Sequence, residues 1–248
     1  MSSTTVAAGT GRKFPGLAQL QRIGRSLMLP IAALPAAGLL LRLGQADLLG
    51  SIPGFETGAA VIASAGGALF DNLPLLFALG VAIGFAKKAD GSTALAAVVG
   101  YLVFSNVGKA MSPLVMGLPA EGDEQVLVNY NVLAGVLMGV VSAVLWQKFH
   151  RIKLPSYLAF FGGRRFVPII TAVVALVLGV LLSFVYPVFS SGLTSFGAFV
   201  SSNDIWGGFL YGTANRMLVP VGLHHILNSM VWFVIGDYNG ATGDLHRR

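Results

Sequence analysis

The residues best suited to chemistry lie close together late in the chain. Arg216, His224, His225 and Asn228 fall within residues 211–235, a stretch that is otherwise apolar. An arginine at bilayer depth costs roughly 2.5–3.5 kcal/mol to insert, so such a residue usually faces a cavity or a substrate path. A histidine can take up or release a proton near neutral pH. We therefore interpret this stretch as the candidate functional site.

A cation and an imidazole together suit the transfer of a phosphoryl group to a hydroxyl. The hydroxyl needs a group that orients it and accepts its proton, and a fixed cation stabilises the charge of the phosphate. Arg216 and His224 supply these two functions, which makes His224 the candidate catalytic residue. The chain lacks the P-loop pattern, so direct use of ATP is not indicated.

Plainer interpretations of the same residues exist. Arg216 and His224 also fit a structural ion pair, or an arginine that caps backbone carbonyls. His224 and His225 could be metal ligands, but the chain has four histidines, no cysteine and no clustered ligand pattern, so we expect neither a metal nor a cofactor. Adjacent side chains point apart on regular backbone, so we expect at most one of the two histidines to face the site.

Two interruptions of the apolar sequence predict broken helices at the substrate site. Pro220 and Gly222 separate the arginine from the histidines, and a proline inside a helix kinks or breaks it. Irregular backbone at membrane depth is tolerated where it is buried or lines a cavity, and transporters build binding sites there. The second interruption, within residues 66–74 and including Asp71 to Pro74, could form one site together with residues 212–222. There Asn72 either binds a polar solute or acts as a helix cap.

The composition predicts an all-α, polytopic transmembrane protein. Hydrophobic residues make up 55% of the 248 and charged residues 10%, against about 25% charged in soluble domains. A β-barrel would show short alternating segments, whereas this chain has continuous apolar runs. The net charge is +6, and the basic residues cluster in short loops beside those runs, as the positive-inside rule requires. We therefore expect no nucleic-acid partner.

The chain divides into a tail and a membrane domain. Residues 1–16 read as a flexible cytoplasmic tail, and residues 17–248 as the transmembrane domain. Alternate crossings then place Lys87 and Lys88 inside, the acidic loop 121–124 outside and the basic loop 148–165 inside, which satisfies the rule at each loop. Apolar spans are expected near 27–44, where Pro30 and Pro35 should introduce a bend, and near 57–86, 92–118, 131–147, 166–190 and 205–236.

A basic loop enters one of these spans. Gly162 and Gly163 precede Arg164 and Arg165, directly before the apolar run that starts at Phe166. Such a loop could contact a phosphorylated partner or an anionic headgroup. Alternatively, its charges act only as a positive-inside anchor.

Four long stretches resemble one family: GRSLMLPIAALPAAGLLLRLGQADLL (24–49), GGALFDNLPLLFALGVAIGFAKK (66–88), KLPSYLAFFGGRRFVPI (153–169) and NRMLVPVGLHHILNSMVWFVIGD (215–237). The chain is similar to enzyme IIC, the membrane subunit of the bacterial phosphoenolpyruvate-dependent sugar phosphotransferase system, in its glucose/N-acetylglucosamine branch. The segments RLGQADLL and WFVIGD favour N-acetylglucosamine over glucose as the sugar.

The resemblance implies a dimeric sugar permease of the inner membrane, in contact with membrane lipid. Sugar would enter an occluded site and receive phosphate on its 6-hydroxyl from a phosphocysteine of a separate enzyme IIB. The family's sugar-site arginine and histidine correspond to Arg216 and His224. Asn72 and His225 are the further substrate-binding residues that we expect.

The chain departs from the family pattern in one respect. The family continues with a T-E-P-[IL]-E-F-type motif, whose glutamate is expected at the sugar 6-hydroxyl, and the chain stops at Arg248 before any such motif. We therefore expect the N-terminal portion of a permease, as a fragment or as half of a split protein. The alternatives are an ion-coupled secondary transporter that leaves its sugar unmodified, and an inactive fragment.

Overall fold

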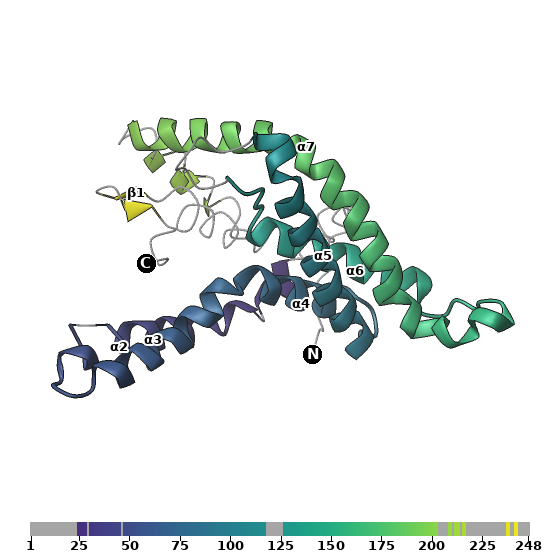
Figure 1. The fold of residues 1–248 in the computed structure, drawn as a ribbon, viewed down its shortest axis with the longest axis horizontal. Coiled ribbons are helices and arrows are strands. Elements are labelled where there is room, and N and C mark those ends of the chain that lie inside the picture. The colour runs from purple at the N-terminus through teal and green to yellow at the C-terminus, as the bar shows by residue number, and fades with distance from the viewer. Residues whose placement is uncertain are drawn as a thin grey trace, which may run out of the picture.

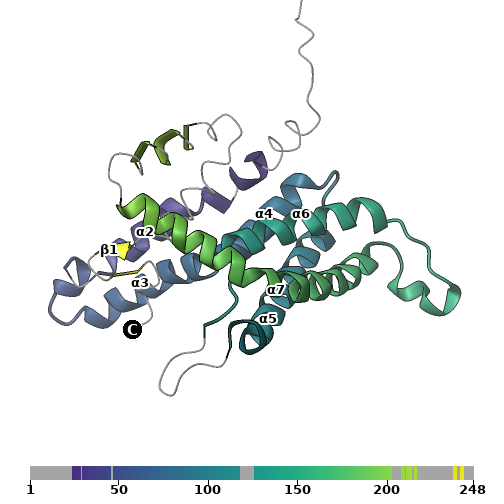
Figure 2. The same cartoon turned by 90° about the horizontal axis from the view of Figure 1, so that it is seen from above.

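The computed structural model describes residues 24–28, 30–45, 47–117 and 126–202, with short pieces at 208–209, 211–213, 215–216, 237–238 and 241–242. These residues are mostly helical. Helices α4 to α7 form a bundle, and α2 and α3 form a hairpin that projects from it (Figures 1 and 2).

The helices are α2 (Leu34–Leu43), α3 (Glu56–Asp71), α4 (Leu73–Phe85), α5 (Gly91–Met116), α6 (Val132–Phe149) and α7 (Phe166–Ser202). Short 3-10 helices are η1 (Leu49–Ser51), η2 (Ser156–Phe161) and η3 (Gly163–Arg165). A two-residue antiparallel ladder joins β1 (Asp237–Tyr238) to β2 (Ala241–Thr242), with Tyr238 opposite Ala241.

Three helical stretches in the described part of the chain are long and apolar enough to cross a membrane: Gly91–Met116, Val132–Phe149 and Gly163–Gly192. Helices α3 and α4 make a fourth if they are taken as one bent span. The predicted all-α, multi-pass membrane class is thus confirmed. Helix α7 continues beyond the expected residue 190. Pro187 lies inside it, and Figure 1 shows α7 changing direction along its length.

The first predicted span is interrupted. Residues 24–28 and 30–31 are helical, a turn follows at Ala32 and Ala33, and α2 begins at Leu34. The bend expected between Pro30 and Pro35 is therefore present. Ten residues of α2 extend about 15 Å, half the thickness of the hydrocarbon core, so this helix alone does not cross it.

The interruption predicted at Asp71 to Pro74 is present, whereas the one predicted at Pro220 and Gly222 lies outside the described residues. Helix α3 ends at Asp71, α4 begins at Leu73, and the two axes differ by 52°. Pro74 lies in the first turn of α4, where its missing N–H is not needed. The sequence Asn-Leu-Pro therefore ends one helix and starts the next.

Glycines set how closely the bundle helices approach. Gly135 and Gly139 lie on the face of α6 that packs against α4, and a Cβ on Gly135 would overlap with the carbonyl oxygen of Pro74. A Cβ on Gly139 would lie 2.7 Å from the oxygen of Ala78. Small residues four apart let membrane helices pack backbone to backbone, which replaces the hydrophobic driving force that lipid does not provide.

Candidate functional site

Arg216 belongs to the short helical pieces near residue 210. Its side chain is exposed and lines an open hollow. The other described residues that line this hollow are Gly208, Phe209, Gly212 and Thr213. The Arg216 guanidinium can approach a polar solute closely, because two of the neighbouring lining residues, Gly208 and Gly212, carry no side chain.

The remaining predicted residues of this stretch lie outside the described part of the chain. His224, His225 and Asn228 are among them, so their roles stay predictions. Asn72 is described, but it is not among the residues that line the hollow at Arg216.

Asn72 is exposed at the junction of α3 and α4 and holds the end of α3. Its Nδ2 donates to the carbonyl oxygen of Ala68 at 2.9 Å, and its own carbonyl oxygen accepts from the N–H of Leu76 at 3.0 Å. The side chain makes no cap to α4, so the expected N-cap is instead a bond to the preceding helix. Within the described residues no hydrogen bond involves Oδ1, and this oxygen can accept from a solute hydroxyl.

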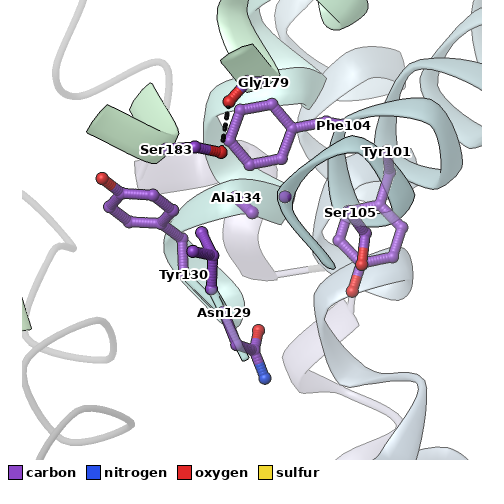
Figure 3. Close-up of a pocket in the computed structure, with 10 residues that line it drawn as sticks. Tyr101, Phe104, Ser105, Asn129, Tyr130, Ala134, Gly179 and Ser183 are labelled. Atoms are coloured by element: carbon purple, nitrogen blue, oxygen red, sulfur yellow. Dashed lines mark hydrogen bonds between the residues drawn. The ribbon is translucent and has the colours of Figure 1, made fainter. Parts of the chain in front are cut away.

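A small polar pocket lies between α5, α6 and α7, and the sequence had not indicated it (Figure 3). Tyr101, Ser105, Asn129 and Ser183 contribute polar groups to its lining. Its volume of about 10 Å³ is at the lower limit for one water molecule, so it cannot hold a hexose.

Tyr130 closes that pocket and connects the loop before α6 to α7. Its hydroxyl donates to the carbonyl oxygen of Leu182 at 2.8 Å, and its ring lies 5.1 Å from that of Tyr186. Burial, and to a smaller extent the neighbouring Tyr186, raises the pKa of Tyr130, so the hydroxyl stays protonated and able to donate. We assign this cluster a structural role.

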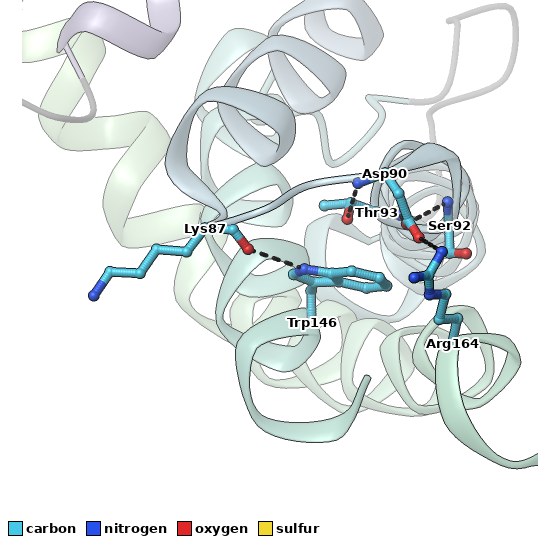
Figure 4. A network of polar contacts seen from close by, with 6 residues as sticks. All are labelled: Lys87, Asp90, Ser92, Thr93, Trp146 and Arg164. Atoms are coloured by element: carbon cyan, nitrogen blue, oxygen red, sulfur yellow. Dashed lines mark hydrogen bonds and ion pairs between the residues drawn. The ribbon is translucent and has the colours of Figure 1, made fainter. Parts of the chain in front are cut away.

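A polar network joins four helix ends at the other end of α6 (Figure 4). Asp90 Oδ1 accepts from the N–H of Ser92 at 2.9 Å and of Thr93 at 3.3 Å, and Thr93 Oγ1 accepts from the N–H of Asp90. The other carboxylate oxygen of Asp90 pairs with Arg164 at 2.9 Å. This network places the loop after α4 beside the loop before α7.

Trp146 completes the network. Its indole Nε1 donates to the carbonyl oxygen of Lys87 at 3.4 Å, and the side chain is buried. The Asp90-to-Thr93 spacing is a helix-start signal that sequence reasoning could have used. The pairing with Arg164 has no such signal, because 74 residues separate the partners.

Replacing Asp90 with alanine should lower the free energy of unfolding by about 1–2 kcal/mol. Loss of an N-cap costs about 1 kcal/mol, and a largely exposed ion pair adds up to about 1 kcal/mol. Asp90→Asn keeps the cap and loses the pair, so it should cost less. Thermal unfolding of the purified protein in detergent measures both. Equal losses for the two variants would show that the cap contributes nothing.

The broken α3–α4 pair, the apolar spans and the exposed Arg216 define a multi-pass membrane protein with polar groups placed at interruptions of its helices. The chain belongs to the family described as phosphotransferase system, EIIC, which matches residues 24–246.

Two relatives give the extent of the similarity. The chain is 49% identical over 249 residues to the PTS system N-acetylglucosamine-specific EIIC component of Streptomyces coelicolor, which covers 98% of this chain and 59% of that protein. It is 45% identical over 238 residues to the PTS system glucosamine-specific EIICBA component of Bacillus subtilis. This match covers 92% of this chain and 36% of that protein. The chain therefore spans about three fifths of the first relative and about one third of the second.

Proposed function

We propose that the chain is the N-terminal portion of an N-acetylglucosamine permease of the phosphotransferase system, which moves the sugar inward and phosphorylates its 6-hydroxyl. The observation that carries this proposal is the 49% identity, across 98% of the chain, to an N-acetylglucosamine-specific EIIC component. The glucosamine-specific relative supports an amino-sugar substrate over glucose.

Each predicted site residue has one task in this proposal. Arg216 binds the sugar hydroxyls or the incoming phosphate, whose charge it stabilises. His224 orients the 6-hydroxyl and accepts its proton as the oxygen bonds to phosphorus and the bond from phosphorus to the donor sulfur breaks. Asn72 accepts a hydrogen bond from the sugar through Oδ1, and His225 supports His224.

The phosphate donor lies outside this chain. None of the 248 residues is a cysteine, so a phosphocysteine must belong to an enzyme IIB. The name of the glucosamine-specific relative, an EIICBA component, is consistent with a B unit that works beside the membrane unit. We further propose an inner-membrane homodimer with its N-terminus in the cytoplasm, an orientation that places the basic loops near Lys87 and Arg164 inside.

The product of transport tests the proposal. Vesicles that contain the complete permease and the soluble phosphotransferase proteins should accumulate sugar 6-phosphate, one molecule for each phosphoenolpyruvate consumed. Omitting phosphoenolpyruvate should stop accumulation. Free sugar inside the vesicles, dependent on an ion gradient, would instead establish a secondary transporter and contradict the proposal.

A further inference from the structure

The segment between α6 and α7 projects from the bundle as an ordered loop, beyond the paired ends of these helices (Figures 1 and 2). The N–H of Gly163 donates to the carbonyl oxygen of Ile152 at 2.9 Å, which closes the base of the loop. Arg165 Nη1 donates to the carbonyl oxygen of Phe160 at 3.2 Å. The loop therefore has a defined shape although little of the bundle covers it.

Three aromatic side chains of η2 are exposed. The exposed fraction is 81% for Tyr157, 70% for Phe160 and 45% for Phe161, and we call these three residues the aromatic foot. Large apolar side chains that gather on a surface mark a site of interaction with another molecule or a membrane. The foot is therefore a candidate interaction surface.

Exposed cations accompany the foot. Arg151, Lys153 and Arg165 form what we call the basic rim, and the Arg165 guanidinium lies 4.6 Å from the centre of the Phe160 ring. Arg164 is paired with Asp90 and is not counted. Residues 148–166 contain no Asp or Glu, so the loop favours an anionic partner.

The position of the foot along the chain favours lipid as that partner. The apolar stretch that can cross a membrane starts at Gly163, two residues after the foot ends, so the foot lies near the hydrocarbon edge. Exposed apolar side chains continue along α7 at helical spacing, at Ile169, Val173 and Val177. This stripe faces outward from the bundle, as a lipid-contacting helix surface does.

We propose that the aromatic foot and the basic rim bind the phosphate headgroups of anionic phospholipids in the cytoplasmic leaflet. Aromatic rings prefer the headgroup level, and each cation near an anionic surface adds to the attraction. The choice of the cytoplasmic leaflet rests on the orientation given under the proposed function. Lipid binding by the loop does not depend on which sugar is transported or phosphorylated. The loop would then fix the depth at which α7 enters the bilayer.

The depth of the foot can be measured with a single labelled cysteine, because the chain has none of its own. The probe position is Tyr157→Cys, and the control is Lys87→Cys in the neighbouring basic loop. In nanodiscs whose lipids carry brominated acyl chains, a fluorophore at position 157 should be quenched several-fold more than one at position 87. Equal quenching would overturn the proposal. Efficient disulfide formation between two copies through position 157 would also overturn it, because a second copy would then cover the foot.

The charge requirement is tested with a paired variant. Arg151→Gln with Lys153→Gln should weaken the preference for brominated phosphatidylglycerol over phosphatidylcholine by about fivefold per charge removed. Lys87→Gln with Lys88→Gln makes the same change in net charge outside the basic rim and should weaken the preference clearly less. An equal loss in both would overturn the proposal. Added inorganic phosphate should not displace the lipid, and displacement would assign the rim to free phosphate instead.

Discussion

Arg216→Ala should reduce phosphoenolpyruvate-dependent sugar phosphorylation by roughly 100-fold or more in the complete permease. A fixed donor aimed at developing charge is worth about 10²–10³ in rate, and the methyl group of alanine supplies neither charge nor hydrogen bonds. Because Arg216 is exposed in its hollow, its removal should leave membrane insertion unchanged. The rate is measured as sugar 6-phosphate formed in vesicles that contain equal amounts of inserted protein.

Two comparisons separate the site from a general effect of charge. Arg216→Lys keeps the charge but loses the planar fork, so it should retain partial activity. Arg42→Ala removes another exposed arginine, one that pairs with Asp47 at 2.7 Å, and should leave the rate near its original value. Normal phosphorylation by Arg216→Ala would remove this residue from the site.

His224→Ala should show the same loss of phosphorylation in that assay, since a hydroxyl without an orienting base transfers its proton poorly. Sugar binding should fall less than the rate, because the imidazole acts mainly on the 6-hydroxyl in this proposal. If binding and rate fall equally, His224 only binds the sugar.

Gly135→Ala should be the most destabilising of the conservative changes in the bundle. The added Cβ overlaps with the carbonyl oxygen of Pro74, a backbone atom that cannot rotate away. Overpacking costs about 1–3 kcal/mol or more, which exceeds the gain of about 1 kcal/mol from helix propensity. We expect the unfolding temperature in detergent to fall by roughly 5 °C. Since Pro74 lies two residues from Asn72, the break between α3 and α4 should shift as well.

Gly38→Ala is the matched control. Gly38 lies inside α2, and nothing lies within 4 Å of the position that its Cβ would take. Alanine should therefore be neutral or slightly stabilising there. If both substitutions behaved alike, close packing of α6 on α4 would not contribute to stability.

Local sequence predicted the membrane class and two places where helices break, between Pro30 and Pro35 and at Asp71 to Pro74. Apolar runs longer than the bilayer is thick leave few alternatives to spanning helices, and Asp71 to Pro74 carries both a stop and a start signal within four residues. The turn at Ala32 and Ala33 likewise follows from prolines that flank it. These features depend on neighbouring residues alone, so a single sequence contains them.

The described part of the candidate site was predicted less completely than the fold. The sequence singled out Arg216 and Asn72 because polar groups are costly in an apolar run, and the structure finds both exposed. Of the two roles that it left open for Asn72, solute binding and helix cap, the cap is not formed at α4, because the amide bonds to the carbonyl of Ala68 instead. The side chain of Asn72 can reach either the end of α3 or the start of α4. Which of these two hydrogen bonds forms depends on the angle between the helices.

By itself, then, the sequence determined a helical membrane protein with breaks at Asn72 and a resemblance to enzyme IIC, because hydropathy and turn chemistry act over a few residues. Only the tertiary structure decided that Asp90 pairs with Arg164, that Gly135 meets Pro74, and that Tyr157 is left uncovered. Each of these depends on how distant helices pack against one another, and close approach between distant segments has no signature in local composition.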